Sequence, residues 1–562
     1  MHDPFADDGL PGGDAPREVW IIEAPGKSRA LTALLGRMGR RADVYSTKGH
    51  LFSFPEGLEP LGIDADGHDH GRTIRDPDRV VAIRKAAARA SRVYVATDAD
   101  QEGDVIAWDV ATVISDIVPD PVRVRLRGID EDAVRDALDA PGDVRPEDAV
   151  PGRTRAIVDR VIGATFSRPG LPVGRVGSAV IGLAAGGIDR DRATIVAPAV
   201  GGGRPFVCSF DFGSTVSRAT VERLVGREWP ALVPGSTGPS TYAPGDTSRM
   251  ISRAGDDLDM PPTQTMKGLQ TLYEEGRFSY PRSDGKGLSP ASARALARAL
   301  RDVGIKAREE ALATKADTDT HDAPHPVGPV RCRGSVEALG DVEGLREVAA
   351  RDLARASVVR SADRADDGPV RREMERMGLT AAQINHVLAE GFVREMGPRV
   401  PDEDAYPSSG VRGRRADVVL VERMTAAGVG RPSTWAHHAE KSLARGLVDA
   451  DLRPTARGRR CLEAAPPSLR TPELCARVEG VIADLPRHGT DASPAWERNA
   501  MAILSRVPDD VRAPVAERLA REPSVPRRDP VDRSAPDGPR RPDVVADVPA
   551  PAPSRAARPR PF

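Results

Sequence analysis

A chain of 562 residues is longer than one hydrophobic core can organise, so we expect several domains. The net charge of -2 does not by itself indicate nucleic-acid binding, although basic residues could still gather on one inner surface. No apolar run is long enough to span a bilayer and no secretory signal is visible, which favours a soluble, cytoplasmic protein without a membrane partner. The four scattered cysteines exclude a disulfide framework, and the absence of a CxxC pair excludes a zinc ribbon.

The N-terminal part of the chain alternates strands and helices. Residues 1–17 are rich in Gly, Asp and Pro and predict a disordered leader. An apolar strand at 19–22 precedes a helix at 28–38. A second buried strand at 93–96 precedes a helix at 102–114, whose apolar residues recur at helical spacing. This alternation predicts a parallel, doubly wound sheet, with ligands beyond the carboxyl ends of its strands.

The remainder of the chain predicts mostly helix. From about 140 to 500 the helical pattern is interrupted by Gly- and Pro-rich stretches near 200–204 and 231–246 and by a loop at 399–413. The last segment, 506–562, is rich in Pro and Arg and predicts a disordered tail.

Acidic residues alternate directly after the second predicted strand. Asp98, Asp100 and Glu102 occupy every second position, and an extended backbone places such positions on one side. Glu23 ends the other predicted strand, so a parallel sheet would bring it alongside. Converging carboxylates suit Mg²⁺, which takes few protein ligands and keeps several waters. The residues alone leave open a simpler interpretation, a solvated acidic turn that caps the following helix.

Three segments of this region resemble the Toprim domain of type IA topoisomerases: residues 22–27 (IEAPGK), 47–51 (TKGHL) and 97–108 (TDADQEGDVIAW). Toprim domains also occur in primases and some nucleases, but the first two segments favour topoisomerases. Gln101 stands where the family usually has Arg, and Asp104 where it usually has Glu. The resemblance implies catalytic roles for Glu23 and Lys27, a Mg²⁺ site formed by Asp98, Asp100 and Glu102, and a DNA contact from His50.

The candidate nucleophile is Tyr280, which follows a predicted helix at 264–276 that ends at Gly276. A phenol has an ordinary pKa of about 10, so it needs a nearby cation to act as a nucleophile. Arg282 lies two residues further, on the same side of an extended segment, and could stabilise both the phenolate and a charged phosphorus centre. Taken alone, a Tyr beside Pro and Arg is more often structural.

A resemblance to the type IA active-site segment changes that interpretation. Residues 272–284 (LYEEGRFSYPRSD) closely follow the family pattern LYExGxITYxRTDS, whose second Tyr is catalytic. Ser283 stands for the usual Thr and keeps its hydroxyl, whereas Gly285 stands for the usual Ser and loses it. The resemblance therefore implies that Tyr280 is the nucleophile and Arg282 its catalytic partner.

Later segments arrive in the family's order. Residues 158–163 (VDRVIG) with 174–178 (GRVGS), 320–326 (THDAPHP) and 428–435 (GVGRPSTW) resemble the family's DRxxG…GRVQ, HEAIRP and GIGRPSTY segments. Read alone, a lone His is more often structural, and a Gly/Pro stretch is only a turn that opens a helix. The resemblance implies DNA contacts from Arg175, His321, Arg431, Ser433 and Thr434, the last three on a single-stranded backbone.

The implied architecture is a multidomain α/β and α fold. A Toprim parallel-sheet domain at 18–140 would join a mostly helical, toroidal body at 141–505, with the active-site Tyr segment at 263–330. The implied activity is transient cleavage of one DNA strand through a 5′-phosphotyrosyl link, strand passage and religation, which relaxes negative supercoils or decatenates DNA. This chemistry needs no ATP, in agreement with the absence of a GxxxxGK[ST] loop. The expected partners are single-stranded and negatively supercoiled DNA, bound by a cytoplasmic, nucleoid-associated monomer.

A second interpretation is a Toprim nuclease or primase-like protein that has lost strand passage. Gln101, Gly177 (for the usual Gln) and the segment 330–420, which matches no family segment, keep it open. The two interpretations differ in one product, because only a topoisomerase leaves a denaturation-stable tyrosyl–DNA adduct.

Overall fold

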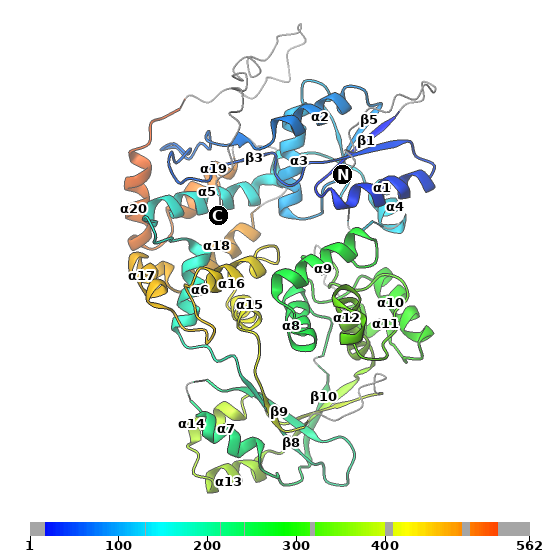
Figure 1. Cartoon of the computed structure of the whole chain (residues 1–562), viewed down its shortest axis with the longest axis vertical. Coiled ribbons are helices and arrows are strands. Elements are labelled where there is room, and N and C mark those ends of the chain that lie inside the picture. The colour runs from blue at the N-terminus through cyan, green and yellow to red at the C-terminus, as the bar shows by residue number, and fades with distance from the viewer. Residues whose placement is uncertain are drawn as a thin grey trace, which may run out of the picture. The chain divides into compact units, whose positions relative to one another are not determined.

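The computed structural model describes residues 17–525 apart from 127, 130, 214, 241, 315–320, 399–407 and 486–494 (Figure 1). The chain divides after Ser524, and every element below belongs to the part before that point. Among the described residues, no helix combines the length and apolar character needed to cross a membrane. The predicted leader lies outside the described residues except for Arg17, whose carbonyl accepts a hydrogen bond from the Ser91 amide at 2.9 Å.

The N-terminal region contains the predicted parallel sheet. Its order is β2-β1-β5-β6-β7, in which β1 pairs in parallel with both β2 and β5, β5 pairs in parallel with β6, and β7 is an antiparallel edge. The strands are β1 (Glu18–Ile22), β2 (Ala42–Ser46), β5 (Arg92–Val95), β6 (Val122–Arg123) and β7 (Gly142–Asp143). Because β1 and β5 are neighbours, the residues that follow their carboxyl ends meet at one edge of the sheet.

Helices cover both faces of this sheet (Figure 1). Side chains alternate along each strand, so Trp20 and Ile22 pack under one helical layer while Val19 and Ile21 pack under the other. One layer contains α1 (Gly26–Arg37) and α4 (Glu131–Asp139), and the other contains α2 (Pro77–Ala87) and α3 (Gln101–Ile114). A small hairpin, β3 (Phe52–Ser53) with β4 (Thr73–Ile74), lies between β2 and α2 in the chain. The predicted doubly wound α/β arrangement is confirmed.

The turn between β5 and α3 fixes the acidic segment. Asp100 is the N-cap of α3, and one of its carboxylate oxygens accepts a hydrogen bond from the Gly103 amide at 2.7 Å. A side chain at residue 103 is excluded, because a Cβ there would lie 2.1 Å from the carbonyl oxygen of Asp98. The glycine therefore allows the backbone of Asp98 to pack directly against the first turn of the helix.

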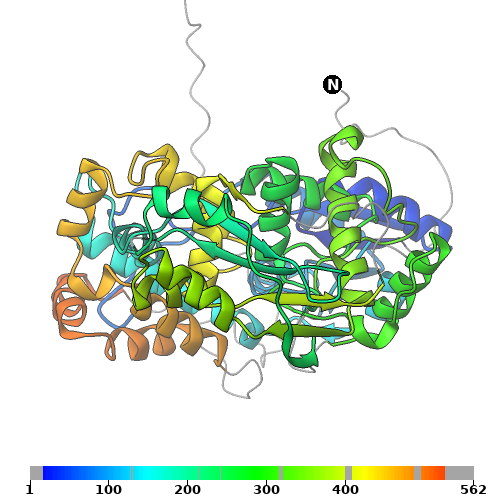
Figure 2. The same cartoon turned by 90° about the horizontal axis from the view of Figure 1, so that it is seen from below.

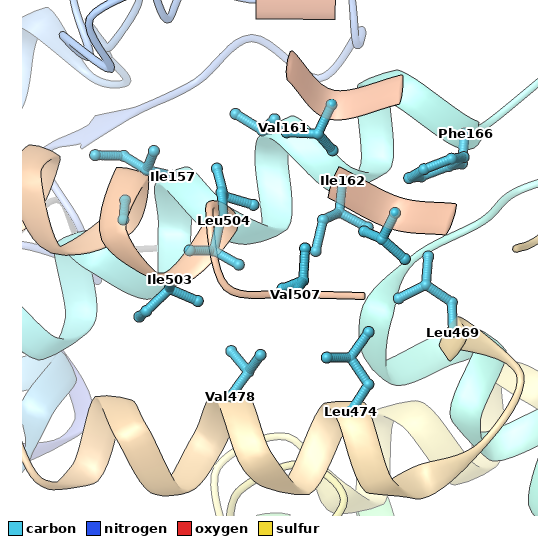
Figure 3. Packing of buried hydrophobic residues seen from close by; sticks show 14 of the residues in the cluster. Ile157, Val161, Ile162, Phe166, Leu469, Leu474, Val478, Ile503, Leu504 and Val507 are labelled. Atoms are coloured by element: carbon cyan, nitrogen blue, oxygen red, sulfur yellow. The ribbon is translucent and has the colours of Figure 1, made fainter. Parts of the chain in front are cut away.

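One group of helices joins the beginning of the body to its end. α5 (Val150–Phe166) packs beside α19 (Ala495–Leu504) and α18 (Pro472–Ala483), although more than 300 residues separate them in the chain. Figure 3 shows the apolar side chains between them, among them Ile157, Val161, Val478 and Leu504. The remaining members of the group are α6 (Arg175–Ala185), α15 (Ala416–Ala426), α16 (Trp435–Ala444), α17 (Ala456–Ala464), α20 (Asp509–Ala520) and the 3₁₀ turns η1 (Pro146–Ala149) and η3 (Pro467–Leu469).

The predicted disordered tail is wrong for its first residues. Residues 509–520 form helix α20, whose Val511, Val515 and Leu519 are buried in the core that α5 and α18 share. The Arg and Glu residues between these apolar positions hid the helical spacing, and Pro514 lies inside the helix itself. Residues 526–562, which make up most of the predicted tail, lie outside the described residues.

A second helical group contains the Tyr280 segment. It consists of α8 (Thr247–Leu258), α9 (Pro262–Glu274), α10 (Pro290–Asp302), α11 (Glu309–Leu312), the 3₁₀ turn η2 (Glu337–Leu339) and α12 (Asp341–Val358). Two apolar cores hold it together, one around Leu269, Leu272 and Phe278 and one around Leu296, Leu300 and Leu353. Gly276 adopts a positive φ of 70° directly after α9, which confirms the predicted C-terminal glycine of that helix.

The body also contains a sheet that the sequence analysis did not predict. Six strands lie in the order β10-β11-β12-β9-β8-β13 and pair in antiparallel fashion (Figure 2). The helices of its apolar core are α7 (Arg218–Val225), α13 (Gly368–Arg376) and α14 (Ala381–Val387). The strands are β8 (Arg192–Ala197), β9 (Phe206–Asp211), β10 (Pro234–Pro239), β11 (Ser361–Ala365), β12 (Val393–Met396) and β13 (Gly410–Arg412). Burial alternates strictly along β8 and β9, a two-residue period that the sequence analysis missed.

The first prediction tests whether α20 is part of the fold. Replacing Leu519, which is 4% exposed, by Ala should lower the free energy of unfolding by about 2–5 kcal/mol, because it removes buried methyl groups and leaves a cavity. Val481→Ala, on the outer face of α18, is the control and should change stability by less than about 0.5 kcal/mol. Denaturant unfolding measures both, and equal stability of the two variants would contradict the packing of α20.

Candidate active site

Three carboxylates meet at the carboxyl ends of β1 and β5. Glu23 follows β1, and Asp98 and Asp100 follow β5. Burial, followed by the negative charges of Asp98 and Asp100, raises the pKa of Glu23 from 4.5 to about 8. One oxygen of Glu23 is buried and has no hydrogen-bond partner among the described residues. The predicted neighbourhood of Glu23 with these two acids is therefore present in the structure.

Lys27 brings a cation into this acidic group. It lies in the first turn of α1, is 1% exposed, and forms an ion pair with Asp98. Its ammonium also lies 4.3 Å from the centre of the Tyr273 ring, on α9 of the second helical group. Such a contact between a cation and an aromatic face is favourable when both are removed from water. Lys27 thus contacts side chains from the sheet and from the helices that carry the Tyr280 segment.

Tyr280 lies at the same place. It is 2% exposed, and its hydroxyl donates a hydrogen bond to the carboxylate oxygen of Asp100 that does not cap α3. Its ring stands edge-on to Tyr273, with ring centres 5.6 Å apart, and lies 4.5 Å from the ring centre of His321. Burial, then the charges of Asp100 and Asp98, raise the pKa of Tyr280 well above its ordinary value, so the phenol keeps its proton in this arrangement.

The backbone around Tyr280 is held by two neighbouring segments. The Ser279 amide donates to the carbonyl of His325 at 2.9 Å, and the His325 amide donates to the Ser279 hydroxyl at 2.9 Å. On the other side, the Ser283 amide donates to the hydroxyl of Thr247 at 2.8 Å. A Cβ at Gly285 would lie 2.2 Å from the carbonyl oxygen of His321, so the chain has no room there for the family's usual Ser.

Arg282 supplies the second cation. Burial alone would lower the pKa of its guanidinium, but the negative charges that Tyr280 (when ionised), Glu23, Asp98 and Asp100 present outweigh it and raise that pKa. Arg282 in turn opposes the rise in the pKa of Tyr280. The predicted pairing of the phenol with a guanidinium two residues away therefore agrees with the electrostatics of the site.

Glu102 and His50 lie on another side of the acidic segment. Glu102 is not among the charges that raise the pKa of Glu23, but it acts on His50. The Nδ1 atom of His50 lies 4.0 Å from the Asp109 carboxylate, and burial is the main cause that lowers the pKa of this imidazole. The ligand atoms of Asp98, Asp100 and Glu102 do not all lie within 4.8 Å of one another in the described part of the chain.

Among the described residues, the one group of three His, Cys, Asp or Glu side chains whose ligand atoms all lie within 4.8 Å of each other is His68, Asp69 and Glu497. An arginine already supplies a cation there, because Arg153 forms an ion pair with Asp69. This cluster connects the segment between β3 and β4 to α19 through the contact of His68 with Glu497 at 2.9 Å. We interpret it as a structural connection.

Asp104 does not contribute to the acidic group. It forms ion pairs with Arg123 at 3.0 Å and Arg125 at 3.2 Å. Arg123 is fully buried and also donates to the carbonyl oxygens of Thr97 and Asp98, both at 2.9 Å. The sequence analysis missed Arg123, although a charged residue inside a short buried strand was a signal that it needs a partner.

Arg175 and Arg431 meet at a buried carboxylate, that of Glu479. Arg175 is 1% exposed and pairs with Glu479 at 2.7 Å and with Asp159, so contact with DNA would require these ion pairs to open. Arg431 and Arg155 also pair with Glu479, at 2.8 and 3.2 Å. Burial would raise the pKa of Glu479, but the three guanidinium groups lower it to about 2.

Arg155 extends this network to the acidic segment. It donates a hydrogen bond at 2.9 Å to the side chain of Gln101, the residue that replaces the family's usual Arg. A guanidinium therefore lies beside this position although it comes from α5. In the GVGRPSTW segment, the Arg431 amide donates to the Thr434 hydroxyl at 3.2 Å, and Ser433 is half-buried.

Comparisons with known proteins find similar sequences and a similar fold. Residues 18–127 match the Toprim domain, a metal-binding domain that typically takes Mg²⁺. The chain is 24% identical over 522 residues to reverse gyrase 2 of Aeropyrum pernix, a match that covers 76% of this chain and 42% of that protein. It is 23% identical over 511 residues to the plasmid DNA topoisomerase I of Xylella fastidiosa, covering 77% of this chain and 74% of that one. The chain is related to the type IA DNA topoisomerases.

The fold supports the same relationship. The structure matches full-length topoisomerase I from Thermotoga maritima with a TM-score of 0.58 over 88% of this chain and 90% of that one, at 17% sequence identity. The Toprim sheet and the mostly helical body thus correspond to a topoisomerase I fold. The match to the reverse gyrase spans about two fifths of that protein's length, so this chain corresponds to only part of it.

The second prediction concerns the pH dependence of stability. The unfolded chain releases the Glu23 proton near the ordinary pKa of 4.5, whereas the folded chain keeps it up to about 8. The folded state binds more protons between these values, so this carboxyl lowers stability as the pH rises through that window. Glu23→Gln should therefore raise the free energy of unfolding above pH 8, by at most about 5 kcal/mol for an isolated group, and should raise it little near pH 5.

Denaturant titrations in EDTA at the two pH values measure this difference. Glu131→Gln, at an exposed position of α4, is the control and should show no pH-dependent gain. A gain for Glu23→Gln that is equal at both pH values would contradict the proton held by Glu23.

Proposed function

We propose that this protein is a type IA DNA topoisomerase that cuts one DNA strand through Tyr280, passes DNA through the gap and reseals the strand without ATP. One observation carries the proposal: the Tyr280 hydroxyl is hydrogen-bonded to Asp100 beside Asp98, Glu23 and two cations. Burial against carboxylates keeps this phenol protonated at rest, so its ionisation needs a base and nearby cations, and the site supplies Asp100, Lys27 and Arg282. The arrangement suits a nucleophile whose proton has an acceptor already in place.

The cleavage step can be followed atom by atom. The Tyr280 hydroxyl gives its proton to Asp100, and its oxygen attacks a phosphorus of the DNA backbone. The bond from phosphorus to the 3′ oxygen breaks, which leaves a 5′-phosphotyrosyl link and a 3′ oxygen that takes a proton from Lys27. Arg282 stabilises the charge that develops on the phosphoryl oxygens. Resealing reverses these steps, and because the link conserves the phosphodiester energy, no ATP is needed.

Glu23 tunes the proton donor. With a pKa of about 8 it is largely uncharged near neutral pH, so it adds little negative charge beside Lys27 until the site gains a cation or loses a proton. Lys27 can then release its proton to the 3′ oxygen more readily than it could beside a full set of carboxylates. We assign Glu23, Lys27, Tyr280 and Arg282 to the chemistry of the reaction.

The acidic residues fit a Mg²⁺ ion. One oxygen of Glu23 is buried without a hydrogen-bond partner among the described residues, and burial together with the charges of Asp98 and Asp100 raises the pKa of Glu23 in spite of the opposing charges of Lys27 and Arg282. We propose that Asp98 and Asp100, with Glu102 from the same segment, would hold Mg²⁺ once their present partners are displaced. Bound there, Mg²⁺ would neutralise the phosphate and the acids that surround it.

The DNA partner follows from the same proposal. We infer that single-stranded DNA, exposed in negatively supercoiled molecules, is the substrate, and that the enzyme acts as a monomer in the cytoplasm at the nucleoid. His321, whose ring lies against Tyr280, would contact the phosphate near the nucleophile. Arg431, Ser433 and Thr434 would hold the strand further away, with His50 and, after its ion pairs open, Arg175. Tyr280 is almost fully buried, so the segments around it must open before a DNA phosphate can reach its hydroxyl.

The third prediction tests the nucleophile. Tyr280→Phe removes one hydroxyl and little packing, so the variant should fold and bind single-stranded DNA but form no covalent adduct and relax no supercoils. Tyr273→Phe is the matched control, because this neighbouring ring is equally buried and its hydroxyl has no hydrogen-bond partner among the described residues. It should still form the adduct. Labelled single-stranded DNA, trapped with denaturant and separated by electrophoresis, measures both; an adduct formed by the Tyr280→Phe variant would refute the assignment.

The fourth prediction tests the acids. Replacing Asp98 and Asp100 together by Asn should leave single-strand binding intact but raise the Mg²⁺ concentration needed for relaxation, or abolish relaxation. Asp116→Asn, whose carboxylate pairs with Arg84 on the outer surface, is the control and should leave the requirement unchanged. Relaxation is measured across a Mg²⁺ titration, and an unchanged midpoint in the double variant would rule out metal binding by these residues.

The same adduct assay separates the proposal from a Toprim nuclease or primase. A nuclease would cut the labelled strand but release both fragments free of protein. A primase would leave the strand uncut.

A further inference from the structure

Thr47 is a buried threonine that directly follows β2, next to the acidic group of the candidate active site. It is 3% exposed, and its hydroxyl is buried with no hydrogen-bond partner among the described residues. The other buried threonines in the described part of the chain each donate a hydrogen bond to a carbonyl oxygen: Thr97, Thr154, Thr165, Thr247 and Thr265. Because buried polar groups are nearly always hydrogen-bonded, the exception at Thr47 needs an explanation.

Thr47 lies beside Glu23 in the sheet. The parallel register of β1 with β2 ends with Ile22 opposite Ser46, and the Thr47 amide continues the ladder by donating to the Ile22 carbonyl oxygen at 2.8 Å. Glu23 and Thr47 are therefore the next residues opposite each other, on strands that lie about 4.8 Å apart. Opposite residues of neighbouring strands project their side chains to the same face of a sheet.

These two side chains lack the same kind of partner. One oxygen of Glu23 is buried without a hydrogen-bond partner in the described part of the chain, as is the hydroxyl of Thr47. The ammonium of Lys27 at this edge of the sheet pairs with Asp98 instead. An ionised carboxylate can only accept hydrogen bonds, whereas a hydroxyl can accept two and donate one. The group that satisfies both must therefore donate a hydrogen bond to Glu23, and it can donate a second one to Thr47.

A metal-bound water molecule meets both requirements. A DNA phosphate does not fit against an ionised Glu23, because phosphate oxygens are negatively charged and only accept hydrogen bonds. A water molecule on Mg²⁺ directs its oxygen toward the ion and both of its O–H groups outward, so it donates two hydrogen bonds. Mg²⁺ keeps several such water molecules when a protein binds it through a few carboxylates.

We propose that Thr47 is a positioning residue of the Mg²⁺ site, where its hydroxyl and the second oxygen of Glu23 accept the two hydrogen bonds of one water molecule on the hydrated ion. The inference rests on the proposed function, because it takes the acidic group to bind Mg²⁺ for DNA cleavage. Thr47 contacts neither the DNA nor the ion, and it acts by holding this water molecule in place. Its β-branched side chain suits that task, because few rotamers are open to it.

The test replaces Thr47 by Val, which removes the hydroxyl and keeps the shape of the side chain. In EDTA the variant should be at least as stable as the unaltered chain, because no hydrogen bond within the described chain is lost. Mg²⁺ should stabilise the unaltered full chain without DNA, and Thr47→Val should need about 10-fold more Mg²⁺ for half of that stabilisation. Denaturant unfolding across a Mg²⁺ titration measures both effects.

Two further variants serve as controls. Thr47→Ser keeps the hydroxyl and should keep a Mg²⁺ midpoint close to that of the unaltered chain. Thr154→Val alters an equally buried threonine whose hydroxyl donates to the Trp496 carbonyl oxygen at 3.2 Å, so it should lose stability in EDTA and keep the Mg²⁺ midpoint. The proposal is overturned if Thr47→Val loses stability in EDTA as Thr154→Val does, if its Mg²⁺ midpoint is unchanged, or if Mg²⁺ does not stabilise the unaltered chain.

Adduct formation on labelled single-stranded DNA separates this inference from the proposed function. If the unaltered chain forms the Tyr280 adduct and Thr47→Val needs no additional Mg²⁺ for its stability, only the inference fails. If the unaltered chain forms no adduct, the proposed function fails, and the stability titrations still decide whether Thr47 helps to hold the hydrated ion.

Discussion

Several negative charges held together at a buried position need cations, and this constraint organises the molecule around its candidate active site. The parallel sheet brings Glu23, Asp98 and Asp100 to one edge, where burial and then the charges of Asp98 and Asp100 raise the pKa of Glu23 to about 8. Lys27 comes from the sheet region, whereas Arg282 comes from the second helical group. The pocket is therefore neutralised only when both regions meet, and the same meeting places the Tyr280 hydroxyl on Asp100. The need to balance these carboxylates with cations therefore affects both how the two regions pack and where the Tyr280 hydroxyl lies.

The sequence predicted the centre of this site more completely than its surroundings. Acids after two apolar strands are a strong local signal, because a parallel sheet leaves few alternatives for where strand ends lie. The resemblance added Tyr280, Lys27 and Arg282, which no spacing rule could have brought beside those acids. The sequence analysis missed the residues that form hydrogen bonds to the acidic segment from neighbouring elements. Arg123 and Arg155 come from other elements, and their partners are fixed by tertiary packing alone.

The fold was predicted correctly where the spacing of apolar residues follows a single strand or helix period over a whole element. The strands and helices of the N-terminal sheet, and the end of α9 at Gly276, follow from local pattern. The sequence analysis missed the antiparallel sheet because β10 is wholly exposed and three of its five pairings, β10–β11, β9–β12 and β8–β13, join residues more than 100 positions apart. The sequence analysis missed helix α20 because the helix contains a Pro and because charged residues surround its three buried apolar positions. Apart from the alternation along β8 and β9, which was visible in the sequence, the deciding contacts are distant in sequence, where pattern analysis has no information.

The close approach of Gly285 to His321 has an evolutionary consequence. The family's usual Ser at this position would place its Cβ 2.2 Å from the His321 carbonyl oxygen, a distance that backbone atoms cannot tolerate. Residue 285 and the course of the His321 segment are thus epistatic, because a serine at residue 285 can be accommodated only if the His321 backbone also moves.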